Sequence, residues 1–141
     1  AFRDRWLGRY LRDDPQFFYL LFDGEGRTAG YLAGAIEDPA RSPRFADVGY
    51  FSGLAPLTKR FPAHLHINLA PQYRSRGWGQ MLIRAFVADA VAAGAPGVHV
   101  VTGWGVRNVR FYLAAGFREV GQATWRDRKL VMLGLELASA S

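Results

Sequence analysis

The sequence contains no cysteine among its 141 residues. This absence excludes a disulfide framework, a cysteine-ligated zinc or iron–sulfur site, and a cysteine nucleophile. Lysine is almost as scarce, since Lys59 and Lys129 are the only two. No apolar run reaches the roughly 20 residues that a bilayer-spanning helix needs. We therefore expect a soluble protein without a membrane segment, located in the cytoplasm.

The composition indicates one folded domain over residues 1–141. Half of the residues are hydrophobic, 21% are charged and the mean hydropathy is −0.06, values that argue against disorder. The formal net charge of +6 suits a phosphate, a nucleic acid or an anionic surface as partner. Because no block of five or six basic residues occurs and the arginines look dispersed, the charge does not predict a nucleic-acid partner.

The first half of the chain predicts a helix, a hairpin and a long excursion. Aromatic residues spaced four apart predict an amphipathic helix over residues 2–11, which Asp13-Asp14-Pro15 ends. Two apolar runs, 17–22 and 28–36, predict a β-hairpin around the turn at 23–26. Residues 37–62 are rich in proline, glycine and aromatics, so we expect an irregular segment with one short helix. Long loops of this kind in compact domains are often functional.

The second half predicts strands and helices in alternation. The expected strands are 64–70, 98–102, 120–125 and 130–137, and the expected helices are 77–93 and 106–115. Gly94 and Gly116 follow the two helices, where glycine commonly ends a helix. The order of elements predicts an α/β (α+β) protein, in which helices pack on a mixed sheet.

The strongest chemical signal is a glycine turn between a predicted strand and a predicted helix. It reads Gln72-Tyr73-Arg74-Ser75-Arg76-Gly77-Trp78-Gly79. Such a turn directs free backbone N–H groups and the positive end of the helix dipole at one point. Gly77 and Gly79 let the backbone curl around an anion, and Arg74 and Arg76 add positive charge. The pattern predicts a phosphate-binding turn.

Two common phosphate motifs do not fit this turn. A P-loop needs Gly-Lys-Ser/Thr, but Gln80 and Met81 follow Gly79. A dinucleotide-binding turn needs a third small residue where this sequence has Leu82. The next strand also lacks the acidic residue that would bind a ribose.

The arrangement that remains is R-x-x-G-x-G, formed by Arg74, Gly77 and Gly79, followed by N-x-x-F-Y-x-x-x-G-F over residues 108–117. In this order and at this distance, the two motifs resemble the GCN5-related N-acetyltransferase (GNAT) superfamily across residues 17–137. The run 61–67 resembles a bacterial subgroup whose relatives include the acetyltransferase-like domain of some O-GlcNAc hydrolases.

The resemblance implies a mostly antiparallel central sheet with helices on both faces, the GNAT fold. It also implies acetyl-CoA as co-substrate, an amine acceptor and no metal, and a homodimer is compatible with it. The turn would hold the pyrophosphate, and the last residues of strand 64–70 would pair with the pantetheine arm. The expected cofactor-binding residues are Leu69, Ala70, Gln72, Arg74, Ser75, Arg76, Gly77, Trp78, Gly79, Gln80, Asn108 and Phe111.

The same resemblance makes Tyr112 the acid that protonates the departing thiolate, because it stands one helical turn after Asn108. The alternative for Tyr112 is a core aromatic. The strand before the turn carries His64, His66 and Asn68 on one face, where relatives often have a carboxylate. His66 is our candidate base, and the alternative is a hydrogen-bonded core histidine. A metal site of these histidines with His99 is rejected, because no carboxylate ligand is evident nearby.

Two functions follow from these residues. One is an N-acetyltransferase that passes the acetyl group directly to an amine of a small molecule or protein, since without cysteine no acetyl-cysteine relay exists. The other is a catalytically idle module that binds CoA or a protein partner. The acceptor would approach over residues 37–62 and the final hairpin. There, four aromatic residues would line its pocket or form the floor: Phe45, Tyr50, Phe51 and Phe61.

Overall fold

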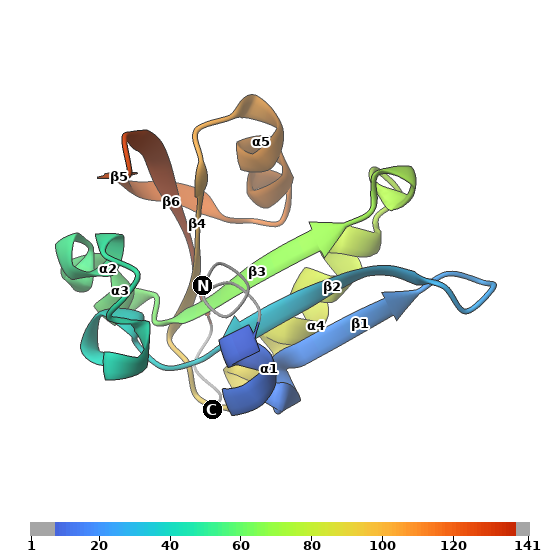
Figure 1. Cartoon of the computed structure of the whole chain (residues 1–141), viewed down its shortest axis with the longest axis horizontal. Helices are drawn as coiled ribbons and strands as arrows, with labels where there is room; N and C mark the ends of the chain where they lie inside the picture. The colour runs from blue at the N-terminus through green and yellow to red at the C-terminus, as the bar shows by residue number, and fades with distance from the viewer. Residues whose placement is uncertain (1–7, 138–141) are drawn as a thin grey trace.

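A computed structural model describes residues 8–137, and its centre is one six-stranded sheet (Figure 1). The strand order is β1-β2-β3-β4-β6-β5, and every neighbouring pair is antiparallel except β3 with β4, which is parallel. The mixed, mostly antiparallel sheet is therefore confirmed. The strands are β1 (Phe18–Phe22), β2 (Thr28–Ala35), β3 (Ala63–Leu69), β4 (Gly97–Gly103), β5 (Arg118–Trp125) and β6 (Arg128–Glu136).

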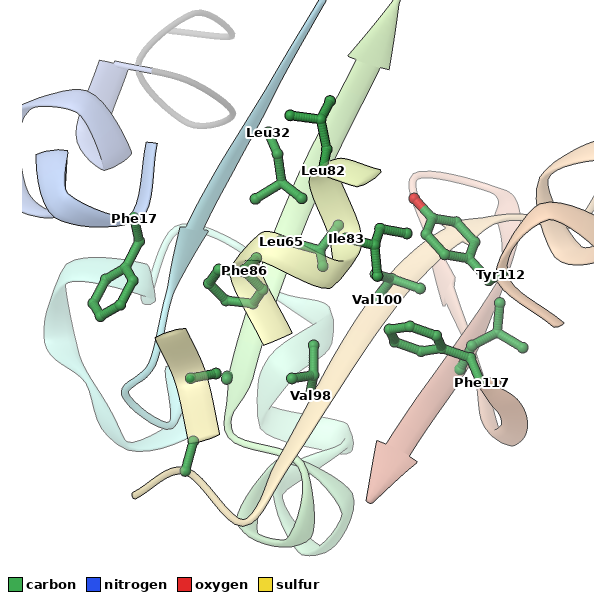
Figure 2. Packing of buried hydrophobic residues seen from close by; sticks show 14 residues of the cluster. Phe17, Leu32, Leu65, Leu82, Ile83, Phe86, Val98, Val100, Tyr112 and Phe117 are labelled. Carbon is green, nitrogen blue, oxygen red and sulfur yellow. The ribbon is translucent and has the colours of Figure 1, made fainter. Parts of the chain in front are cut away.

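One face of the sheet is covered by the two longer helices, α4 (Trp78–Ala92) and α5 (Val106–Ala114). Figure 2 shows the apolar cluster between these helices and the sheet, with Phe86 and Ile83 of α4 over the strands. Both helices end as the glycines predict: Gly94 and Gly116 have φ of +85° and +97°. After Gly116, the N–H of Phe117 donates to the carbonyl of Tyr112, so that Phe117 packs back on the last turn.

The opposite face is covered by α1 (Arg9–Asp13), α2 (Tyr50–Gly53) and α3 (Ala55–Arg60). The helix expected over 2–11 lies partly outside the described residues, and the described part ends at Asp13. The segment 37–62 is more regular than expected, because it holds two short helices as well as the 3₁₀ turns η3 (Pro39–Arg41) and η4 (Pro43–Phe45). A proline begins each 3₁₀ turn, where its missing N–H costs no hydrogen bond. Two further 3₁₀ turns are η2 (Pro15–Phe17) and η5 (Pro71–Tyr73).

The parallel pairing of β3 with β4 is short. Only Ala63 with Val98 and His64 with His99 are in register, and beyond them the two strands separate. The separated ends lie toward α5 and toward the turn that precedes α4 (Figure 1). Strand β3 therefore leaves part of its backbone without a partner strand on that side.

Candidate active site

A cavity of about 890 Å³ lies where β3 and β4 separate. Its walls come from the end of β3, the glycine turn, the first turn of α4, the end of β4 and helix α5. The lining residues are Ile67, Asn68, Leu69, Arg74, Ser75, Gly77, Gly79, Gln80, Thr102, Arg107, Asn108, Arg110, Phe111, Tyr112 and Ala114. Both motifs found in the sequence thus border the same cavity.

The glycine turn has the backbone shape that an anion site requires. Ser75 and Gly77 have φ of +62° and +81°, and Gly77 is the residue that caps α4. The first helical hydrogen bond runs from the N–H of Met81 to the carbonyl of Gly77. The N–H groups of residues 78–80 therefore have no partner within the helix and face the end of the cavity with the positive end of the helix dipole.

Gly79 permits a close contact between two helices. A Cβ at this position would lie 2.8 Å from the Phe111 ring and 3.1 Å from Leu69 Cδ1. Gln80 strengthens the same contact, because its side-chain Nε2 donates to the Phe111 carbonyl at 3.2 Å. Phe111 and Gln80 thus hold α5 against the first turn of α4 and fix one wall of the cavity.

The free edge of β3 presents backbone groups of alternate residues to the cavity. The N–H of Ala70 donates to the Ala29 carbonyl on β2 at 3.0 Å. Since neighbouring residues of a strand point their backbone groups to opposite sides, those of Ile67 and Leu69 point toward β4, which has moved away. The Leu69 carbonyl accepts from Arg74 Nε at 3.1 Å. The expected backbone donor at Ala70 is thus already used, and the structure adds Ile67, which the sequence reasoning missed.

Asn108 and Tyr112 both border the cavity, as their spacing on one helix face predicts. Asn108 is exposed and its Nδ2 donates to Thr102 Oγ1 at 3.2 Å. Tyr112 is buried between Phe111 and Phe117, and Figure 2 shows its ring in the apolar cluster. Burial raises the pKa of the Tyr112 hydroxyl, which therefore remains a proton donor at neutral pH.

His66 lies outside the residues that line the cavity. Its Nε2 is 3.2 Å from the Tyr10 hydroxyl, and the two rings meet edge to face. Burial, with smaller contributions from His99 and Arg9, lowers the pKa of His66 to about 4. The ring is therefore neutral at pH 7. Within residues 8–137, no group of three His, Cys, Asp or Glu side chains could hold a metal ion.

Several other expected residues lie away from the cavity. Gln72 and Arg76 are exposed and do not line it, and the Trp78 ring stacks on Tyr73 instead. Two arginines of α5, Arg107 and Arg110, do line the cavity; Arg107 directly precedes the second motif and Arg110 stands at a variable position within it, so the motif gave no signal for either. The four aromatics considered for an acceptor pocket are all buried in a second apolar cluster, on the face of the sheet that α1, α2 and α3 cover: Phe45, Tyr50, Phe51 and Phe61.

The cavity thus lies between two separating strands and is bordered by the glycine turn. Residues 1–117 match the family model described as "Acetyltransferase (GNAT) family", and the chain belongs to that family of N-acetyltransferases. No helix within residues 8–137 is long and apolar enough to cross a bilayer.

Solved structures agree with this assignment. The crystal structure of SsHAT is 26% identical, with a TM-score of 0.77, over 98% of this chain and 81% of that one. Naa20 of Chaetomium thermophilum, solved with a bisubstrate analogue, is 20% identical at a TM-score of 0.70, covering 92% and 70% of the two chains. The polyamine N-acetyltransferase of Drosophila melanogaster is 17% identical at a TM-score of 0.72, covering 92% and 79%. The last two similarities concern the fold alone.

Proposed function

We propose that this chain transfers the acetyl group of acetyl-CoA directly to an amine of a small molecule or protein. The observation that carries the proposal is the single cavity that joins an anion-binding turn to the free edge of β3 and to Tyr112. Acetyl-CoA supplies a thioester that an amine attacks. The proposal keeps the cytoplasmic location expected from the sequence, and a homodimer is compatible with it.

Different parts of the chain bind different parts of acetyl-CoA. The N–H groups of residues 75–80 bind the pyrophosphate, and Arg74 completes the turn by holding the Leu69 carbonyl. The backbone of Ile67 and Leu69 pairs with the amide groups of the pantetheine arm, as a neighbouring strand would. Asn108, next to Thr102, binds the same arm from the other wall.

The chemical step uses a donor, an acid and a base. A backbone N–H near Leu69 polarises the thioester carbonyl, in the role of an oxyanion hole. The Tyr112 hydroxyl gives its proton to the departing thiolate, and its raised pKa keeps that proton available. His66 removes the proton of the amine; it shares a face of β3 with Asn68, which lines the cavity.

Binding and turnover can be tested separately. We expect calorimetry to detect CoA binding to the wild type and its loss in Gly77→Glu, which places a charged side chain at a φ of +81° in the turn. We expect Tyr112→Phe to lower kcat for thiol release in an amine screen while CoA still binds. Tyr19→Phe is the matched control, because Tyr19 bonds Asp89 away from the cavity. If no CoA species binds at millimolar concentration, the proposal fails.

The second candidate function is a catalytically idle module that binds CoA or a protein partner. Asn68 cannot accept a proton, and His66 lies outside the cavity lining; both observations favour it. The resemblance of residues 61–67 to acetyltransferase-like domains of O-GlcNAc hydrolases points the same way. Acetylation of any amine that depends on Tyr112 would rule the idle module out.

A further inference from the structure

The β1–β2 hairpin is bonded to the glycine turn through one tyrosine. Tyr73, the last residue of η5, donates its hydroxyl hydrogen to Asp23 Oδ2 at 2.5 Å. Asp23 begins the hairpin turn, 50 residues earlier in the chain. The contact therefore ties the start of the glycine turn to a different part of the sheet.

Asp23 is a fixed acceptor, because its own turn holds the carboxylate in place. Asp23 Oδ1 accepts the N–H groups of Glu25 and Arg27, each at 2.9 Å, and its side chain is only 9% exposed. The hydrogen bond from Tyr73, with those from Arg27 and Glu25, lowers the pKa of Asp23 to about 2. The carboxylate is thus ionised and oriented whether or not the cavity holds a ligand.

The ring of Tyr73 contacts the other end of the turn. It stacks on Trp78, with ring centroids 5.1 Å apart and planes 18° apart. Trp78 is the first residue of α4, so residues 74–77 form a loop whose two ends are joined by this stack. We call Asp23, Tyr73 and Trp78 the clasp.

The loop inside the clasp is held in an unfavourable backbone conformation. Ser75 has a φ of +62°, a left-handed value that is unfavourable for a non-glycine residue, and Gly77 also has positive φ. Among the described hydrogen bonds, none joins the side chain of another cavity residue to Ser75 and so offsets this strain. A restraint at both ends of the loop keeps it from relaxing in the free protein.

We propose that Tyr73 is a positioning residue that holds residues 74–77 in the anion-binding shape, through its bond to Asp23 and its stack on Trp78. The inference rests on the proposed function. Neither Tyr73 nor Trp78 lines the cavity, so the clasp acts on the phosphates of CoA only through the turn. A turn that is ordered before binding loses less conformational entropy on binding, and this raises affinity.

The test uses hydroxyl and carboxylate deletions that keep size and stacking. We expect Tyr73→Phe, Asp23→Asn and the double variant each to weaken CoA binding about tenfold, without further loss in the double, because the bond between Tyr73 and Asp23 is lost in all three. NMR titration with pantetheine, which lacks the phosphates, should give the wild-type affinity in every variant. Tyr19→Phe is the matched control: it removes another tyrosine–aspartate bond of 2.5 Å, from Tyr19 to Asp89.

Two further outcomes separate the clasp from the proposed function. In ligand-free protein, ¹⁵N relaxation should show lower order parameters for the amides of residues 75–77 in Tyr73→Phe than in wild type or Tyr19→Phe. If wild type binds no CoA, the proposed function fails and the relaxation result still judges the clasp. Unchanged order parameters, wild-type CoA affinity in Tyr73→Phe, or an equal loss for pantetheine would overturn the inference.

Discussion

Acid should destabilise this protein through two stacked histidines in its second core. The rings of His64 and His99 lie 5.3 Å apart at 18°, and their side chains sit against Phe45 and Phe51. Each Nδ1 donates to a backbone carbonyl, of Pro62 at 3.1 Å and of Phe61 at 2.5 Å. Each Nε2 is buried and has no hydrogen-bond partner among the described residues. A proton on either Nε2 would therefore be a charge without solvent or acceptor.

The magnitude follows from the shifted pKa values. Burial lowers the pKa of His99 from 6.5 to about 4, and burial together with the neighbouring His99 lowers the pKa of His64 well below 6.5. Because the folded pKa lies below the unfolded one, the unfolded chain takes up protons first as the pH falls. The stabilisation is complete above pH 6.5 and decreases toward pH 4. Between pH 7 and pH 5 the loss is about 2 kcal/mol for His99, and His64 adds a loss in the same direction.

Urea unfolding at pH 7 and pH 5 measures this loss directly. We expect the free energy of unfolding to fall by about 2 kcal/mol through His99, with further losses in the same direction from His64 and His66, and with an unchanged m-value. NMR titration of the ring protons checks the cause, since neither His64 nor His99 should protonate in the folded protein above pH 5. A change below 1 kcal/mol, or a ring of this pair that titrates near pH 6.5, would refute the reasoning.

Three further changes test the packing around the site and the core. Gly79→Ala should weaken CoA binding and lower Tm, because its Cβ meets the Phe111 ring at 2.8 Å; calorimetry that shows wild-type affinity would contradict this. Phe86→Ala removes a fully buried ring and should cost about 3–5 kcal/mol in urea unfolding, whereas a loss under 1 kcal/mol would argue against the packing in Figure 2. Arg44→Ala removes the ion pair with Asp14 at 2.7 Å together with the pairs to Asp13 and Glu37, and should cost about 2 kcal/mol at pH 7; an unchanged free energy of unfolding would contradict this.

Local patterns were enough to predict most of the fold. Apolar, β-branched and alternating runs bounded by turn residues predicted all six strands to within about two residues at each end, because these signals depend on residues close together in the sequence. Gly94 and Gly116 predicted both helix ends, and in the structure both residues have the positive φ that is typical there. The strand order was not predictable, because nothing local indicates that β6 lies between β4 and β5. One short helix was expected within residues 37–62, whereas the structure has two, α2 and α3, each of which is too short to give a clear periodic pattern.

The candidate site, like the fold, was predictable only in part. The sequence was enough to place the glycine turn and the Asn108/Tyr112 pair beside one cavity, because each pattern consists of residues close together in the sequence. Which backbone groups of β3 face the cavity depends on its register with β2, and this assigned Ile67 in place of Ala70. Asp23 could not have been linked to the turn, since its partner lies 50 residues away.

Because β3 and β4 pair at only two positions, the sheet consists of two three-stranded halves, β1-β2-β3 and β4-β6-β5, which are joined at one corner of the sheet. His64 and His99 face each other at that corner, and the cavity occupies the widening gap beyond it. Because the gap between β3 and β4 widens away from this corner, a small change of the angle between the two halves produces a larger change in the width of the gap at its open end. We therefore expect packing around His64 and His99 to influence the width available to a ligand, although neither histidine lines the cavity.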